Sequence, residues 1–152
     1  MAWDVGTIVK LASARSRWAR VRRAPLSFAD EARRTGALKR GLPRTATVEL
    51  DQVVGSVGRA HELGLNFRPS TSHGRIHDSE RFARVRAAMR RGKPLPPVEL
   101  YKLGCAYYVL DGHHRVAAAM DLGQLAIDAS VTEHVPSTGS SCVDADRRRA
   151  LQ

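Results

Sequence analysis

Five consecutive residues, Asp111 to Arg115, combine groups that could bind an anion. An apolar run precedes Gly112 and a helical pattern follows it, so we expect a strand to turn into a helix there. The free backbone N–H groups and the positive dipole end of such a helix favour a phosphate or a carboxylate. The candidate ligand-binding residues are therefore Gly112, His113, His114 and Arg115.

The elements that would position these residues follow from the pattern on either side. Residues 98–103 and 106–110 are rich in β-branched and aromatic residues and predict a hairpin that leads into the bend. Over residues 113–122 the apolar side chains fall on one helical face, and Gly123 ends the pattern. The bend at residues 111 and 112 would thus lie between a strand and a helix.

The histidines allow a second interpretation, in which the protein is an enzyme. His113 and His114 are candidate catalytic residues, because an imidazole can act as a general base near neutral pH. His73 and His77 have the spacing that brings two side chains together on a helix, and with His114 they form a candidate metal site. Gly74 lies between them and disfavours such a helix. A metal-dependent nuclease remains an alternative.

The N-terminal part of the chain is strongly basic. Residues 1–45 hold 11 Lys and Arg residues against 3 Asp and Glu residues, whereas residues 46–134 hold 11 against 10. An amphipathic helix is predicted from Thr7 to Val21, and it favours nucleic acid as a partner. Its apolar stripe would pack on the domain or on a second copy of the chain, as in a homodimer, rather than on lipid. The candidate nucleic-acid contacts are Arg15, Arg17, Arg20, Arg22 and Arg23. Nonspecific DNA binding through this arm is a third interpretation.

Composition limits the class of protein. A chain of 152 residues can form one domain with one modest core. It contains no run of 18 apolar residues and no apolar signal-peptide segment, so we expect no membrane partner. Cys105 and Cys142 have no metal-like spacing and form no disulfide framework, which indicates a reducing compartment. Together these features predict a cytoplasmic protein.

Three regions are expected along the chain. Residues 1–44 form a basic helical arm that ends in a turn-rich linker at residues 39–44. Residues 45–134 form the folded domain. Residues 135–152 are rich in Ser, Thr, Gly and Arg and are expected to be disordered.

Further elements are predicted from local patterns. In the arm, Ser27 begins a short helix that ends at Gly36. In the domain, a helix begins at Asp78 or Ser79 as its cap and ends at Gly92. The other expected segments are a strand over residues 45–50, a turn over 51–54, an irregular stretch over 55–78 and a closing strand over 127–132.

Residues 111–117 read Asp-Gly-His-His-Arg-Val-Ala. They resemble the Gly-Glu-Arg-Arg-x-Arg-Ala box of ParB-type N-terminal domains and the Gly-Cys-His-Arg box of sulfiredoxin, which shares their fold. Further segments extend the resemblance to the ParB-like nuclease domain family over about residues 45–134; they are residues 48–54, 95–100 and 127–131. The resemblance implies a ParB/sulfiredoxin-type α/β (α+β) fold, a small mixed sheet with packed helices, here with an N-terminal helical arm.

The resemblance also implies a ligand. In ParB-type domains the pocket above the glycine binds a nucleoside triphosphate with Mg; here Gly112 would let the backbone approach the phosphates and Arg115 would pair with one. Arg68 stands where the family places an arginine that faces the nucleotide. The family's second phosphate motif has no counterpart after His134, and no helix-turn-helix or dimerisation domain follows, so the usual partition clamp is not implied.

Sulfiredoxin activity is not expected, because His113 occupies the position of the nucleophilic cysteine. The preferred interpretation is a nucleotide- or phosphate-ligand-binding module associated with DNA and regulation in bacteria. NTPase and nuclease activities remain open.

Overall fold

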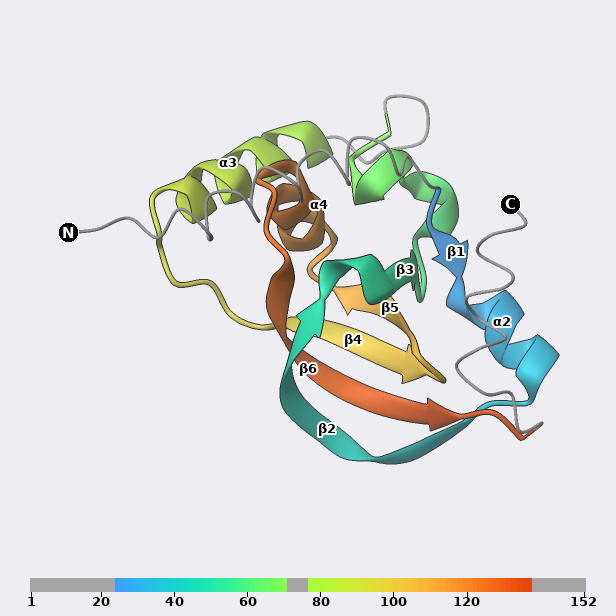
Figure 1. Cartoon of the computed structure of the whole chain (residues 1–152). Helices are drawn as coiled ribbons and strands as arrows, with labels where there is room; N and C mark the ends of the chain where they lie inside the picture. Colours follow the sequence, from blue (N-terminus) through green and yellow to red (C-terminus); the bar gives the residue numbers. More distant parts are fainter. Residues whose placement is uncertain (1–23, 71–76, 138–152) are drawn as a thin grey trace.

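The computed structural model describes residues 24–70 and 77–137, and within them the chain forms one six-stranded mixed sheet with helices packed on it (Figure 1). The strand order is β1-β3-β5-β4-β6-β2. The pairs β1–β3, β3–β5 and β4–β6 are parallel, and the pairs β4–β5 and β2–β6 are antiparallel. The predicted α/β class with a small mixed sheet is therefore confirmed.

The structure bounds each element as follows. The strands are β1 (Leu26–Ser27), β2 (Leu38–Glu49), β3 (Val53–Ser56), β4 (Val98–Leu103), β5 (Ala106–Asp111) and β6 (Ala126–Val135). The α-helices are α2 (Phe28–Thr35), α3 (Asp78–Arg90) and α4 (His113–Asp121). Short 3-10 turns are η1 (Leu50–Gln52), η2 (Ala60–Glu62) and η3 (Leu65–Phe67).

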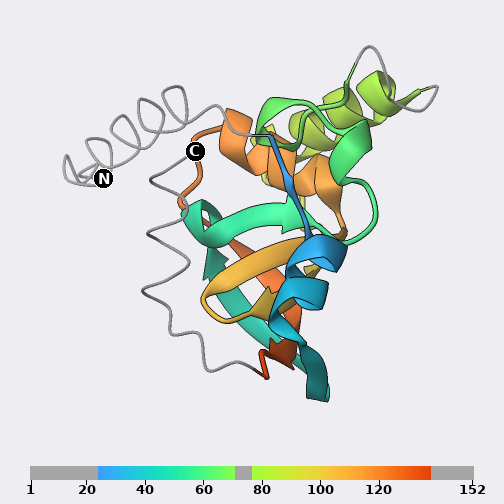
Figure 2. The ribbon, with the colours of Figure 1, turned by 90° about the vertical axis from the view of Figure 1, so that its right-hand side faces the viewer.

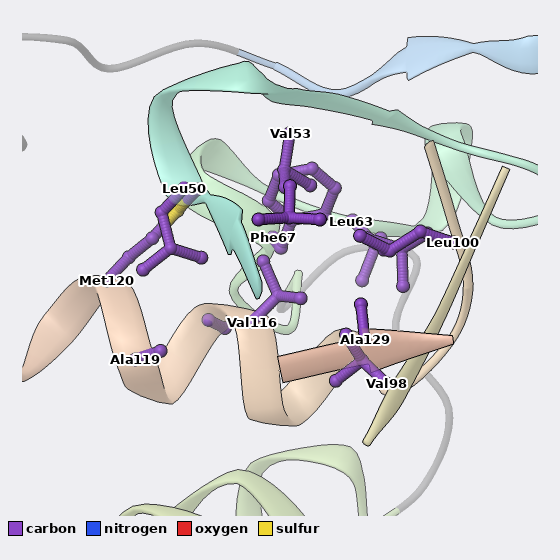
Figure 3. Packing of buried hydrophobic residues seen from close by; sticks show 13 residues of the cluster. Leu50, Val53, Leu63, Phe67, Val98, Leu100, Val116, Ala119, Met120 and Ala129 are labelled. Carbon is purple, nitrogen blue, oxygen red and sulfur yellow. The ribbon is translucent and has the colours of Figure 1, made fainter. Parts of the chain in front are cut away.

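The main core lies between the sheet and the pair α3 and α4 (Figure 1). Figure 3 shows its centre, where Val116 and Met120 of α4 meet Leu50 of η1, Val98 of β4 and other buried side chains. Because side chains alternate along a strand, the opposite face of the sheet buries a second, smaller cluster. On this face α2 lies against the sheet (Figure 2). The ring centroid of Phe28 in α2 is 5.4 Å from that of Tyr108 in β5.

Several predicted elements are confirmed. The hydroxyl of Ser27 accepts a hydrogen bond from the N–H of Asp30, and Gly36 in the left-handed region ends α2. The predicted hairpin is the antiparallel pair β4–β5. The closing strand is longer than expected, because β6 continues to Val135 beside the first residues of β2.

The prediction of a linker at residues 39–44 is wrong, because these residues belong to β2. Backbone pairing with β6 spans Leu38 to Glu49, so the sheet extends across the division placed at residue 44. The register shifts between Arg40 and Arg44, where Gly41 has φ +72° and Pro43 follows. These turn-forming residues make a bulge inside a strand, which explains why the pattern resembled a linker.

Other sequence-based expectations also differ from the structure. Residues 53–56 form β3 rather than part of a turn and an irregular stretch. Asp78 does not cap α3: His77, with φ +73°, precedes the helix, and the Asp78 side chain is buried. Cys105, in the turn between β4 and β5, is disulfide-bonded, so the expectation of reduced cysteines is not supported.

Some expectations concern residues outside those described. They are the N-terminal helix with its five arginines, His73, and the tail from residue 138 onward. In the described part of the chain, no helix is long and apolar enough to cross a membrane.

The bend before α4 lies where the sequence predicts it. Gly112 has φ +102° and α4 begins at the next residue, with no side chain capping its N-terminus. A Cβ atom at Gly112 would lie 2.7 Å from Cγ1 of Val98 and 2.9 Å from Nη2 of Arg115. The glycine is thus required both by backbone conformation and by the close approach of β4.

We predict that Gly112→Ala lowers the free energy of unfolding by about 2 to 4 kcal/mol, because it combines a strained positive φ with a steric clash. Chemical denaturation would measure this change. The matched control is Gly58→Ala, where nothing lies within 4 Å of the added Cβ. Equal stability of the two variants would contradict the requirement for glycine at the bend.

Candidate functional site

Arg115 ties the beginning of α4 to neighbouring backbone. Its Nη1 donates to the carbonyl oxygens of Pro96 and Pro97, and its Nη2 lies 3.0 Å from a carboxylate oxygen of Asp111. The side chain is mostly buried and lines a hollow of about 300 Å³ together with Lys93 and other residues near β4. The guanidinium predicted to face a ligand is thus engaged within the fold.

His113 is buried at the first position of α4. Its Nε2 lies 2.7 Å from the hydroxyl of Ser56, at the end of β3, and that hydroxyl also accepts from the N–H of Arg59. Burial, together with the charge of Arg59, lowers the pKa of His113 from 6.5 to about 4. His113 is therefore neutral at pH 7. Ser56 is completely buried, so this hydroxyl–imidazole pair has no access to a substrate.

His114 lies against a buried ion pair. Its Nε2 is 3.4 Å from one carboxylate oxygen of Asp78, and the other oxygen accepts from Nη2 of Arg59 at 2.7 Å. Arg59 also pairs with Glu62 at 2.8 Å. Burial lowers the pKa of His114, although the Asp78 carboxylate acts in the opposite direction. With the histidines neutral, one guanidinium faces two carboxylates.

We name these residues the buried polar cluster: Ser56, Arg59, Glu62, Asp78, His113 and His114. Of this set, sequence reasoning identified only the two histidines as candidate site residues. Asp78 carried a signal, an acidic residue at a helix start, but that signal indicated a cap. The cluster joins β3, η2, α3 and α4, so it fixes the relative position of these elements.

Arg68 lies elsewhere, near the C-terminal end of α4. Its guanidinium is 3.4 Å from Asp121 and 5.2 Å from the centre of the Phe82 ring. Asp121 also pairs with Arg86 of α3. The fold therefore separates Arg68 from the other predicted ligand residues, which lie at the opposite end of the helix.

An open hollow of about 720 Å³ surrounds Arg68. We name it the arginine hollow; its lining residues are Arg68, Phe82, Ala83, Arg86, Ala87, Arg90, Arg91 and Asp121. Four arginines and one acidic residue thus line the hollow, and two of the arginines, Arg68 and Arg86, pair with Asp121. Local sequence patterns do not bring these arginines into one site, because the pairing with Asp121 joins segments far apart in the chain.

The candidate metal set is not brought together among the described residues. His77 is exposed and lies 3.2 Å from Glu80, whereas His114 faces Asp78. Within residues 24–70 and 77–137, no group of three or more His, Cys, Asp or Glu side chains is placed to hold a metal ion.

Comparison with known proteins gives one similarity. No protein-family model matches the chain, and no curated protein sequence matches it. A similar solved structure is sulfiredoxin from Arabidopsis thaliana, with 15% sequence identity and a TM-score of 0.45. The alignment covers 72% of this chain and 99% of that chain.

We predict that Asp78→Ala lowers the free energy of unfolding by about 3 kcal/mol, because it removes the buried partner of Arg59 and His114. Thermal and chemical denaturation would measure the loss. The matched control is Asp30→Ala, which removes an exposed pair with Arg33 and should cost less than about 1 kcal/mol. Similar losses in both variants would contradict the structural importance of the cluster.

We also predict that stability falls as the pH decreases from about 6.5 to about 4. In this window the unfolded chain binds a proton at His113 that the folded state excludes, so the difference favours unfolding on acidification. The shift corresponds to about 3 kcal/mol, with His114 acting in the same direction. His113→Gln should reduce this pH dependence, whereas the exposed control His77→Gln should leave it intact; the reverse result would refute the assignment.

Proposed function

We propose that the protein is a binding module for a phosphate-bearing ligand and that the arginine hollow holds this ligand. One observation carries the proposal: four arginine residues and a single acidic residue line one open hollow. Arginine presents a planar set of donors that matches two oxygens of a phosphate, and its charge persists at all relevant pH values.

Contacts within the hollow support preorganisation. Asp121 pairs with both Arg68 and Arg86, and the ring of Phe82 lies beneath Arg68. These contacts restrict two flexible side chains, so less conformational entropy is lost when a ligand binds. Arg90 and Arg91 are exposed at the end of α3 and extend the positive surface.

The beginning of α4 is a less favourable place for an anion. The carboxylates of Glu62 and Asp78 outnumber the guanidinium of Arg59 there, and both histidines have lowered pKa values. Arg115 already contacts two carbonyls and a carboxylate. A nucleoside triphosphate, the ligand expected from the sequence, belongs to the proposed class, but the charges favour the arginine hollow as its location.

We predict that inorganic tripolyphosphate and ATP raise the melting temperature of the intact protein. A ligand present at about 100 times its Kd adds about 2.7 kcal/mol to the free energy of unfolding. The double variant Arg68→Gln/Arg90→Gln should weaken binding at least about tenfold, since hydrogen bonds to charged groups contribute about 1.5 to 3 kcal/mol each. The matched control Arg40→Gln/Arg44→Gln removes the same charge from β2 and should bind normally.

Removing the carboxylate of Asp121 should have the opposite effect on binding. Because it competes with phosphate for Arg68 and Arg86, Asp121→Asn should bind tripolyphosphate more tightly than the native protein. Titration calorimetry would measure both variants. Absence of binding to either ligand, or equal weakening by the Arg68/Arg90 and the β2 variants, would refute the proposal.

A further inference from the structure

The positive surface of the arginine hollow continues along α3. The exposed arginines on this helix and directly after it are Arg81, Arg84, Arg90 and Arg91. The two carboxylates of α3 offset only part of this charge, since Glu80 is the one of the two that is exposed. Asp78 is buried against Arg59, and Glu80 lies 3.2 Å from the imidazole of His77. At 3.6 residues per turn, Arg84 and Arg91 lie on the same side of α3, and Arg81 and Arg90 flank that side in opposite directions. The exposed half of the helix therefore carries positive charge from its first turn to its end.

We infer that this face binds the phosphate backbone of a nucleic acid. The inference rests on the proposed function and names the class of ligand for the same site. α3 has 13 residues, so at about 1.5 Å per residue it is about 20 Å long. Duplex DNA carries one negative charge for about every 1.7 Å of its axis, so several phosphates lie within the length of α3. The phosphates of a free nucleotide would contact only part of this face.

The face fits the backbone rather than the bases. The ring of Phe82 packs against the main core and has the guanidinium of Arg68 over it, so it offers no free surface for stacking. α3 contains no Asn or Gln, the residues that pair with adenine edges. We expect contacts with the backbone, which fix the position of the strand. Because arginine can also pair with guanine edges, unequal Kd values for two sequences would contradict this expectation.

A protein partner fits this face less well. The centre of a protein interface is apolar, and arginine is enriched there together with large aromatic residues and Met. None of the large hydrophobic side chains that are exposed in the described part of the chain lies on α3. Charge complementarity thus favours a polyanion.

The experiment measures binding of the intact chain to labelled oligonucleotides of two unrelated sequences by fluorescence anisotropy. We expect similar Kd values for both sequences. Between about 50 and 200 mM salt, contacts with about four phosphates should give a slope of about −4 for duplex and about −3 for single-stranded DNA in a plot of log K against log salt. Single-stranded DNA, duplex DNA and inorganic polyphosphate are compared at equal phosphate concentration.

The variant Arg81→Gln/Arg84→Gln/Arg90→Gln/Arg91→Gln should bind DNA at least about tenfold more weakly and with a shallower salt slope. The matched control Arg33→Gln/Arg34→Gln/Arg40→Gln/Arg44→Gln removes the same charge from α2 and β2 and should bind like the native chain. Circular dichroism checks that both variants are folded. Both variants retain the N-terminal arginines, so a difference in DNA binding between them would be due to the arginines of α3.

The outcomes distinguish this inference from the proposed function. If Arg68→Gln/Arg90→Gln weakens tripolyphosphate binding but the α3 variant leaves DNA binding unchanged, the inference fails and the proposed function stands. Binding of polyphosphate without binding of DNA would also overturn the inference. If neither phosphate ligands nor DNA bind, both fail.

Discussion

The ion pair between Arg59 and Asp78 is the interaction on which the arrangement of the helices depends. A buried charge without its partner costs several kcal/mol, so the segment that carries Arg59 and the first turn of α3 must remain together. His114 extends the same contact to α4, and His113 connects it to the end of β3 through Ser56. Four elements are therefore held by polar contacts at a place where the apolar core ends. The arginine hollow lies at the other end of α4 and is lined by residues of α3 together with Arg68 and Asp121.

The two ends of α4 have different electrostatic roles. At its beginning, charges are paired within the fold and the imidazoles are neutral, which makes this end a structural joint. At its end, Asp121 and the negative pole of the helix dipole attract Arg68 and Arg86, and the positive surface of α3 begins beside them. The helix α4 thus connects the buried polar cluster at its beginning with the open, positively charged arginine hollow at its end.

Local sequence patterns predicted those helices, strands and turns that are determined by residues close together in the chain. Gly112 marked the bend, Ser27 and Gly36 bounded α2, and the β-branched and aromatic residues of 98–103 and 106–110 predicted the hairpin. β2 and β3 were missed in part, because their strand character comes from pairing with β6 and β5 rather than from their own composition. The same difference between local and long-range contacts applies to the candidate site. The histidines were visible in the sequence, whereas their partners Ser56, Arg59 and Asp78, and the convergence of Arg68 and Arg86 on Asp121, arise only in the folded chain.

The bulge in β2 has a consequence for association. β2 is an outer strand of the sheet in the described part of the chain, and such a strand can recruit a strand from another molecule. Pro43 offers no N–H group, Gly41 bends the backbone, and Lys39, Arg40 and Arg44 would repel an identical edge. This edge is thereby protected against continuous strand-by-strand growth into aggregates, and the protection comes from the residues that made the segment look like a linker.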